Sequence, residues 1–169
     1  HYCYTKNSLM SVGKLVILGA GESGCGAALL GKSKGYKVFV SDSGQLSSAT
    51  RLLFKREHIE FEEGGHDFSR LNRAEIAVKS PGIPDTAPVV TSLLNHGVEV
   101  ISEIEWGFRF TNKPIIAITG SNGKTTTTAM IHKLLNDAGL SAGLGGNIGK
   151  SFAAQVMSQE PDYYVLEVS

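Results

Sequence analysis

Residues 14–42 read KLVILGAGESGCGAALLGKSKGYKVFVSD, and three segments of different character follow one another within them. The first, at 14–19, is an apolar run that stops at glycine, which is typical of a buried strand. Small and apolar residues at helical spacing fill 23–35, where the final glycine is typical of a helix end. A second apolar run at 36–41 completes a unit of about thirty residues, the length of two parallel strands joined by a helix.

The loop between this first strand and the helix carries the pattern Gly19-Ala-Gly21-Glu22-Ser23-Gly24. Glycines let the turn tighten and let a phosphate approach the backbone, while the helix start supplies free N–H groups and partial positive charge. Asp42 lies eighteen residues beyond Gly24, near the position expected for a ribose-binding acid. Taken alone, the loop favours a nicotinamide-dinucleotide enzyme, and a tight turn without any ligand is the alternative.

Strands and helices continue to alternate along the chain. We expect helices at 47–57, 86–96, 103–110 and 124–138, and strands at 59–61, 75–79, 98–101, 114–119, 140–144 and 162–168. The pattern restarts near residue 112, which predicts an N-terminal extension at 1–12, a first domain at 13–112 and a second at 113–169. The second part is short for an α/β domain and stops in an expected buried strand, so we expect a fragment of a longer protein.

A second glycine loop, Thr119-Gly120-Ser121-Asn122-Gly123-Lys124-Thr125-Thr126, also joins an expected strand to an expected helix. Backbone N–H groups of such a loop cradle a triphosphate, Lys124 can reach its β- and γ-phosphates, and the Thr125 hydroxyl can bind Mg²⁺. The loop departs from the usual phosphate-binding pattern because Ile118 stands where the first glycine belongs. A glycine turn before a threonine-rich helix is the alternative interpretation.

The presence of two such loops reduces the number of protein classes that fit the sequence. A redox enzyme has no evident use for the second loop, and a simple kinase has none for the first. A non-catalytic module that binds a nucleotide sugar would not need Lys124. Together the loops indicate two phosphate-bearing ligands that meet across a cleft between domains.

Composition excludes several other classes. The 169 residues hold 16 basic and 16 acidic side chains, so bulk charge gives no reason to expect nucleic acid or an acidic membrane as partner. No apolar run approaches the roughly 18–20 residues that span a bilayer, and the first twelve residues lack a signal-peptide layout. Only Cys3 and Cys25 occur, which excludes a disulfide framework and favours a cytoplasmic location. The histidines show no metal-ligand spacing and are interpreted as surface or packing residues.

With these motifs in place, the sequence resembles the Mur ligase family. The resemblance rests on residues 117–126 (AITGSNGKTT), 145–149 (GGNIG), 79–83 (KSPGI) and 164–169 (YVLEVS), in matching order across roughly residues 13–169. It implies a Rossmann-like parallel-sheet domain followed by the start of a P-loop ATPase central domain. It also implies an ATP- and Mg²⁺-dependent ligase of peptidoglycan synthesis, cytoplasmic and monomeric, whose first loop holds uridine diphosphate rather than a dinucleotide.

The resemblance further implies roles for individual residues. The UDP-substrate would be bound by Gly21, Glu22, Ser23, Gly24, Asp42, Ser43, Ser80, Pro81, Gly82 and Asn147. ATP would be bound by Gly120, Ser121, Asn122, Gly123, Lys124, Thr125 and Thr126. Lys124 would neutralise charge on the transferring phosphoryl group, and Thr125 and Glu167 would hold Mg²⁺. Read without the resemblance, Glu167 is an exposed strand end and Asn147 a turn or cap residue.

The reaction that the resemblance implies joins D-glutamate to UDP-N-acetylmuramoyl-L-alanine through an acyl phosphate. Members that add another amino acid remain alternatives, since the family's amino-acid-binding domain, a second magnesium-ligand histidine and a carbamylated lysine would lie beyond Ser169. We therefore expect this chain to bind the UDP-substrate, to bind ATP weakly at most, and not to complete the ligation alone.

Overall fold

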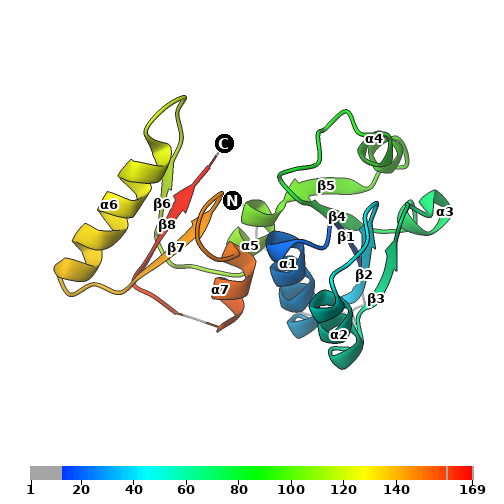
Figure 1. The fold of residues 1–169 in the computed structure, drawn as a ribbon, viewed down its shortest axis with the longest axis horizontal. Coiled ribbons are helices and arrows are strands. Elements are labelled where there is room, and N and C mark those ends of the chain that lie inside the picture. The colour runs from blue at the N-terminus through cyan, green and yellow to red at the C-terminus, as the bar shows by residue number, and fades with distance from the viewer. Residues whose placement is uncertain (1–12, 159, 169) are drawn as a thin grey trace.

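The computed structural model describes residues 13–158 and 160–168, in which strands and helices alternate (Figure 1). The expected extension at 1–12, with Cys3, lies outside the described residues. The elements are β1 (Lys14–Leu18), α1 (Glu22–Ser33), β2 (Lys37–Asp42), α2 (Ser48–Arg56), β3 (Glu60–Glu63), α3 (Phe68–Leu71), β4 (Ile76–Lys79), α4 (Pro88–Asn95), β5 (Glu99–Ser102), α5 (Glu103–Phe108), β6 (Ile115–Ile118), α6 (Lys124–Asp137), β7 (Ala142–Gly146), α7 (Phe152–Ser158) and β8 (Tyr163–Glu167).

The first sheet is parallel throughout, with strand order β3-β2-β1-β4-β5. The chain runs outward from β1 to β2 and β3, and then returns to β4 on the other side of β1. This reversal places the carboxyl ends of β1 and β4 side by side, the position at which open α/β sheets bind ligands. Leu18 pairs with Lys79 in this register, so the loops that follow these two residues are neighbours.

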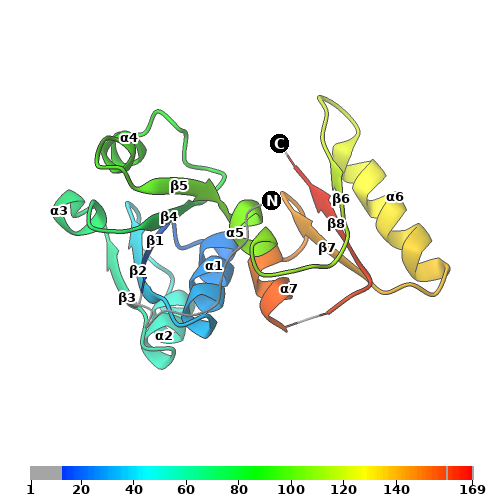
Figure 2. The same cartoon turned by 180° about the vertical axis from the view of Figure 1, so that it is seen from behind.

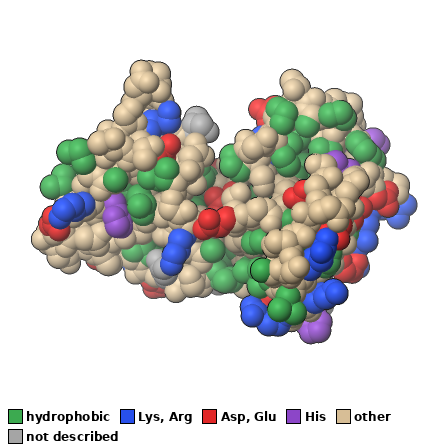
Figure 3. Space-filling model, in the orientation of Figure 1, with side chains coloured by type: hydrophobic (Ala, Val, Ile, Leu, Met, Phe, Trp, Pro, Cys, Tyr) green, Lys and Arg blue, Asp and Glu red, His purple; other side chains and the backbone are tan. Residues whose placement is uncertain are grey.

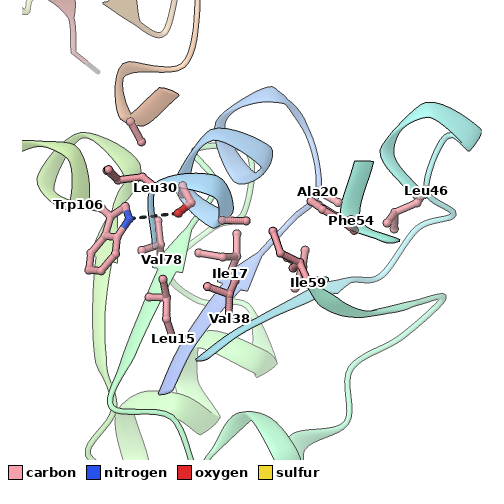
Figure 4. Close-up of a cluster of buried hydrophobic side chains, with 14 residues drawn as sticks. Leu15, Ile17, Ala20, Leu30, Val38, Leu46, Phe54, Ile59, Val78 and Trp106 are labelled. Atoms are coloured by element: carbon pink, nitrogen blue, oxygen red, sulfur yellow. Dashed lines mark hydrogen bonds between the residues drawn. The ribbon is translucent and has the colours of Figure 1, made fainter. Parts of the chain in front are cut away.

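Both faces of this sheet are covered, because successive strand side chains point to opposite sides. Leu15 and Ile17 of β1 pack with apolar residues of α1, α2 and α5 in the cluster of Figure 4. The intervening side chains pack on the other face with α3 and α4. Trp106 of α5 is fully buried in the first cluster, and its indole N–H donates a 3.2 Å hydrogen bond to the carbonyl of Ala27 (Figure 4).

The second sheet is also parallel, with strand order β6-β8-β7. Helix α6 lies along its outer side, and α7 lies between this sheet and α1 in both views (Figures 1 and 2). The register places Glu167, the last residue of β8, between Ile118 and Gly146. The loops after β6 and β7 therefore begin on either side of Glu167.

Helix α7 joins the two sheets. Phe152 packs edge-on against Tyr164 of β8, while Ala153 belongs to the same apolar cluster as α1. At Gly26 of α1 a Cβ atom would lie 1.9 Å from the Ser151 hydroxyl oxygen, so the approach of the two segments requires glycine there. The domain division between residues 112 and 113 stays a prediction. Helix α7, which belongs to residues 113–169, contributes Ala153 to the apolar core formed mainly by residues 13–112.

The parallel α/β fold predicted from the sequence is confirmed, and each expected strand and helix is present with ends shifted by no more than two residues. The strand expected at 140–144 runs instead over Ala142–Gly146, because two glycines fit closely against β8. A Cβ on Gly146 would lie 2.1 Å from the carbonyl oxygen of Glu167. The sequence does not predict α3 or α7. Within the described residues no helix is long and apolar enough to cross a bilayer.

Candidate functional site

The first glycine loop connects β1 to α1 where the strand order reverses. Gly19 has a φ of +89°, and Gly24 has no room for a side chain because its Cβ would lie 1.9 Å from the Gly19 carbonyl oxygen. Gly21, the N-cap of α1, has nothing within 4 Å of its Cβ position. The loop is therefore tight underneath and open above the helix N-terminus, which suits an incoming anion.

Asp42, at the end of β2, holds this loop in place. Its Oδ2 accepts a 2.6 Å hydrogen bond from the N–H of Ala20, and its Oδ1 accepts a 2.8 Å bond from the N–H of Gly44. Each carboxylate oxygen keeps a further lone pair after accepting one bond. Asp42 can therefore accept a ligand hydroxyl while it fixes the loop.

A pocket of about 520 Å³ opens beside Asp42 at the carboxyl edge of the sheet. One end is polar, with Asp42, Ser43 and His66. The remaining wall is mostly apolar and includes Phe68, Ile83, Pro84, Pro88 and Val89, next to Gly82. A flat ring with polar edges and apolar faces, such as a nucleobase, has the chemical character that this lining matches.

His66 is a pocket residue that the sequence does not single out. Its Nδ1 lies 2.7 Å from the hydroxyl oxygen of Ser41, which is fully buried and donates its own proton to Glu62 Oε1 at 2.5 Å. A carboxylate only accepts hydrogen bonds, so the Ser41 oxygen must accept from Nδ1–H of His66. In the neutral tautomer that carries this Nδ1 proton, Nε2 is an acceptor. This role depends on Ser41, twenty-five residues away, and no local pattern reveals it.

The Ser80-Pro81-Gly82 turn follows β4 and packs beneath the first loop. A Cβ at Gly19 would lie 2.6 Å from the Ser80 hydroxyl oxygen, which is buried and has no hydrogen-bond partner among the described residues. Lys79 precedes the turn, and its half-buried ammonium group donates to the carbonyl of Ile83 at 2.6 Å and lies 3.1 Å from Asp85. The turn therefore adds an unpaired hydroxyl and a nearby cation to this edge.

Two further pockets lie between the first loop and the loop that follows β7. One, of about 480 Å³, is lined by Glu22, Ser23, Pro81, Asn147 and neighbouring residues. The other, of about 260 Å³, shares Ser23, Pro81 and Asn147 and also includes Lys79. The molecule is hollowed between its two lobes in the space-filling view (Figure 3). Asn147 thus faces the first loop although 123 residues separate it from Gly24.

The loop that carries Asn147 is tied to β8. The Asn147 N–H donates to the carbonyl of Glu167 at 2.9 Å, and Gly146 and Gly149 have φ values of +92° and +73°. Glycine adopts such values at no steric cost, whereas other residues do so only with strain. The run of glycines at this loop therefore allows Asn147 to sit beside the end of β8.

The second glycine loop follows β6 and starts α6. Gly120 has a φ of +139°, and Gly123, the N-cap, has a φ of +75°. The residues from Gly120 to Gly123 are exposed, and Lys124 turns back over them so that its ammonium group donates to the Gly120 carbonyl at 2.6 Å. This geometry leaves the loop surface and the start of a fourteen-residue helix open to an anion.

Thr125 and Glu167 meet at the base of this loop. The Thr125 hydroxyl donates to Glu167 Oε2 at 2.8 Å, and Glu167 is only 6% exposed. The described residues contain no cluster of three or more His, Cys, Asp or Glu side chains placed for a metal. Mg²⁺ is commonly held by one or two protein oxygens together with phosphates, so a threonine hydroxyl and one carboxylate fit that ion.

The predicted site residues fall into two groups in space. Those assigned to the UDP-substrate surround the first loop and the pockets beside it, and Lys124, Thr125 and Glu167 gather at the second loop. Gly120–Thr126 lines none of the three pockets above. The two groups are linked through Asn147, whose backbone N–H donates to the carbonyl of Glu167.

Comparison with known proteins adds to this geometry. The family description "MurD N-terminal domain" matches residues 14–89, and "Mur ligase middle domain" matches residues 118–169. The chain belongs to the Mur ligase family. The matched ranges hold both glycine loops, so the Mur ligase assignment covers each half of the candidate site.

Individual Mur ligases agree with this assignment. Proteins named UDP-N-acetylmuramoylalanine–D-glutamate ligase from Bacteroides fragilis and Cytophaga hutchinsonii are 49% and 51% identical to this chain over 92% of its length. The chain spans 35% of the length of each of these relatives.

Solved structures show the same fold. UDP-N-acetylmuramate:L-alanyl-γ-D-glutamyl-meso-diaminopimelate ligase from Neisseria meningitidis matches 93% of the chain and 52% of its own, with a TM-score of 0.58 and 25% identity. A pseudomurein peptide ligase type C from Methanothermus fervidus matches 93% of the chain and 33% of its own, with a TM-score of 0.55 and 29% identity.

Proposed function

We propose that this chain forms the UDP-substrate site and part of the ATP site of a ligase that joins D-glutamate to UDP-N-acetylmuramoyl-L-alanine. The observation that carries the proposal is the meeting of two phosphate-type loops through Asn147, which faces the first loop and bonds to the strand end that carries Glu167. The names of the relatives support the choice of substrate. A division of labour between residues 13–112 and 113–169, and a cytoplasmic location, belong to the same proposal.

The first loop and its pockets would bind the UDP part. The base would enter the pocket beside Asp42, Ser43 and Gly82, with the ribose near the Asp42 carboxylate. The diphosphate would lie over Gly21–Gly24 at the start of α1, where backbone N–H groups and the helix dipole favour negative charge. The muramoyl-alanine end would extend past Pro81 toward Asn147, and so toward Glu167.

The second loop would bind ATP and Mg²⁺. Thr125 and Glu167 would hold Mg²⁺, which when bound neutralises phosphate charge. Lys124 would leave the Gly120 carbonyl and balance the negative charge that develops on the γ-phosphoryl group as it moves to the substrate carboxylate. ADP would be the leaving group of this first transfer. The amine of D-glutamate would then attack the acyl phosphate, so that the C–N bond forms, the C–O bond to phosphate breaks, and the amine gives up a proton to solvent.

The oxidoreductase alternative loses its support. A dinucleotide would use the first loop and Asp42 but would give no function to Lys124 or to the Thr125–Glu167 pair. The family and its named relatives also favour a ligase. The choice of D-glutamate rests on the relatives' names, and Mur ligases that add another amino acid are the second candidate.

The proposal is tested by calorimetric titration of the chain with UDP-N-acetylmuramoyl-L-alanine, with NADH as the parallel ligand. We expect binding of the UDP compound and none of NADH. Replacing Gly21 with valine, whose Cβ would have nothing within 4 Å, is expected to cover the helix N-terminus and to weaken binding at least tenfold. The matched control is Ala138→Val, which adds a valine side chain at an exposed position at the end of α6, outside the pockets beside the first loop. Binding of NADH alone would contradict the proposal.

A further inference from the structure

The position of Asn147 depends on a buried amide in α7. Gln155, only 4% exposed, donates from Nε2 to the carbonyl of Leu144 at 2.8 Å and to the carbonyl of Lys150 at 3.0 Å. These carbonyls lie on either side of the turn that carries Asn147. A Cβ at Gly145 would lie 3.0 Å from the same nitrogen, so the turn is closely fitted to Gln155. The two hydrogen bonds of Gln155 therefore couple the position of the Asn147 turn to the position of α7.

Helix α7 is in turn held by Glu103, the first residue of α5. Glu103 Oε1 accepts a 2.6 Å hydrogen bond from the Ser151 hydroxyl and a 2.7 Å bond from the N–H of Ala153. The partners lie 48 and 50 residues away along the chain. The carboxylate therefore occupies the start of α7, where N–H groups have no partner within the helix and negative charge is favourable.

The surroundings of Glu103 leave little freedom for another arrangement. Glu103 is 5% exposed, and this burial raises the pKa of its carboxyl above the usual range. The Ser151 N–H also lies 3.3 Å from Glu22 Oε1, beside the first glycine loop. At Gly107 a Cβ atom would lie 2.7 Å from the ring of Phe152, so α5 and α7 touch directly.

A buried carboxylate is a costly way to join two helices, since well-packed apolar residues often serve as well or better. Here the bonded chain Glu103–Ser151–α7–Gln155 ends at the Asn147 turn, and Glu103 itself lines the pocket of about 260 Å³ with Ser23, Pro81 and Asn147. A series of hydrogen bonds thus connects Glu103 to the turn on the far side of this pocket.

We propose that Glu103 is a positioning residue that fixes Asn147 at the correct distance from the first glycine loop, and so determines how tightly the part of the substrate beyond the nucleoside is held. The inference rests on the proposed function. It distinguishes two parts of the ligand: the base pocket is lined by residues 19–89 alone, whereas the other pockets are lined from both sheets. Loss of the Glu103 contact must therefore affect the two parts unequally.

The test compares two ligands by titration of the chain. Uridine monophosphate reaches only the base pocket and the start of the first loop, whereas UDP-N-acetylmuramoyl-L-alanine extends to Asn147. We expect Glu103→Ala to weaken binding of the second ligand at least fivefold and to change binding of the first less than twofold. Glu103→Gln retains a carbonyl oxygen for Ser151 and Ala153, so it is expected to restore binding to within about twofold of the unaltered chain.

Glu105→Ala is the matched control, because Glu105 lies on the same helix, exposed and paired with Arg109, and should leave both affinities unchanged. Should Glu103→Ala fail to fold, Ser151→Ala removes one of the two bonds and is expected to shift the ratio of the two affinities in the same direction by a smaller factor. If Glu103→Ala or Ser151→Ala weakened binding of both ligands equally, or changed neither affinity, this inference would be wrong while the proposed function would still stand. If the unaltered chain binds neither ligand, the proposed function fails as well.

Discussion

At the scale of single residues, Gly24 and Gly21 of the first loop differ in the space around them: Gly24 is closely packed and Gly21 is open. Gly24→Ala would place a Cβ 1.9 Å from the Gly19 carbonyl oxygen, so we expect it to lower the free energy of unfolding by about 1–3 kcal/mol. Gly21→Ala meets nothing within 4 Å and has a φ of −71°, so it should leave stability within about 0.5 kcal/mol. Urea unfolding of both variants checks the difference. Equal losses of stability would mean that the loop is not tight at Gly24.

His66 offers a second residue-scale prediction, which rests on the proposed function. If its Nε2 accepts a hydrogen bond from the bound nucleoside, His66→Ala should weaken UDP binding about five- to tenfold, the effect of roughly one hydrogen bond. His96 bonds only locally to the Ser92 carbonyl and is exposed, so His96→Ala is the control. Titration with UDP measures both. Unchanged affinity in His66→Ala would show that this histidine merely supports Ser41.

At the scale of elements, the sequence predicted those strands, helices and loops that follow from residue patterns within one short segment. Apolar runs followed by glycine loops predicted β1, β6 and the two loops, and the second loop's pattern predicted Lys124. The role of Glu167 was implied only by the resemblance to the family. Helices α3 and α7 escaped prediction because α3 is a single turn, and α7 is a short stretch whose helical state depends on burial between α1 and β8. The roles of Glu103, Gln155 and His66 depend on distant partners, which no spacing pattern encodes.

The packing of α5 against α1 gives a prediction for an element. Trp106 is fully buried between Tyr36 and Phe110, with ring-centroid distances of 5.2 and 4.9 Å, and its N–H reaches the Ala27 carbonyl. Trp106→Ala should lower the free energy of unfolding by about 3–5 kcal/mol. Phe108, 57% exposed on the same helix, is the control, and Phe108→Ala should cost no more than about 1 kcal/mol. Denaturant unfolding measures both. Similar losses in the two variants would argue that α5 is loosely docked.

At the scale of the whole molecule, the two sheets share one candidate site because α7 crosses between them. The helix follows the Asn147 turn in sequence, yet it packs against α1 and α5 of the first sheet. Under the proposed function, a substrate bound to the first loop would extend toward Asn147, whose N–H donates to the carbonyl of Glu167. The Glu167 side chain in turn accepts a bond from Thr125 of the second loop. Glu103 is bonded to the start of α7 between the two sheets, and the raised pKa of its carboxyl makes its contribution to stability depend on pH.

The last prediction concerns that sensitivity. Burial raises the pKa of Glu103 above its usual value of 4.5, and bonds from Ser151 and Ala153 only partly oppose the rise. The folded chain therefore binds this proton more tightly than the unfolded chain does. The Glu103 contribution to stability must fall as pH rises from about 4.5 through the folded-state pKa, and stay level above it.

Glu103→Gln has no such proton, while carboxyls with a lowered pKa, such as those of Asp67 and Glu99, titrate alike in both chains. The difference in unfolding free energy between Glu103→Gln and the unaltered chain should therefore grow in favour of the variant over that pH range. Urea unfolding at a series of pH values from 4 to 8 measures this difference. A difference that stays constant across the series would mean that the Glu103 carboxyl titrates as it does in the unfolded chain, and that burial does not penalise its charge.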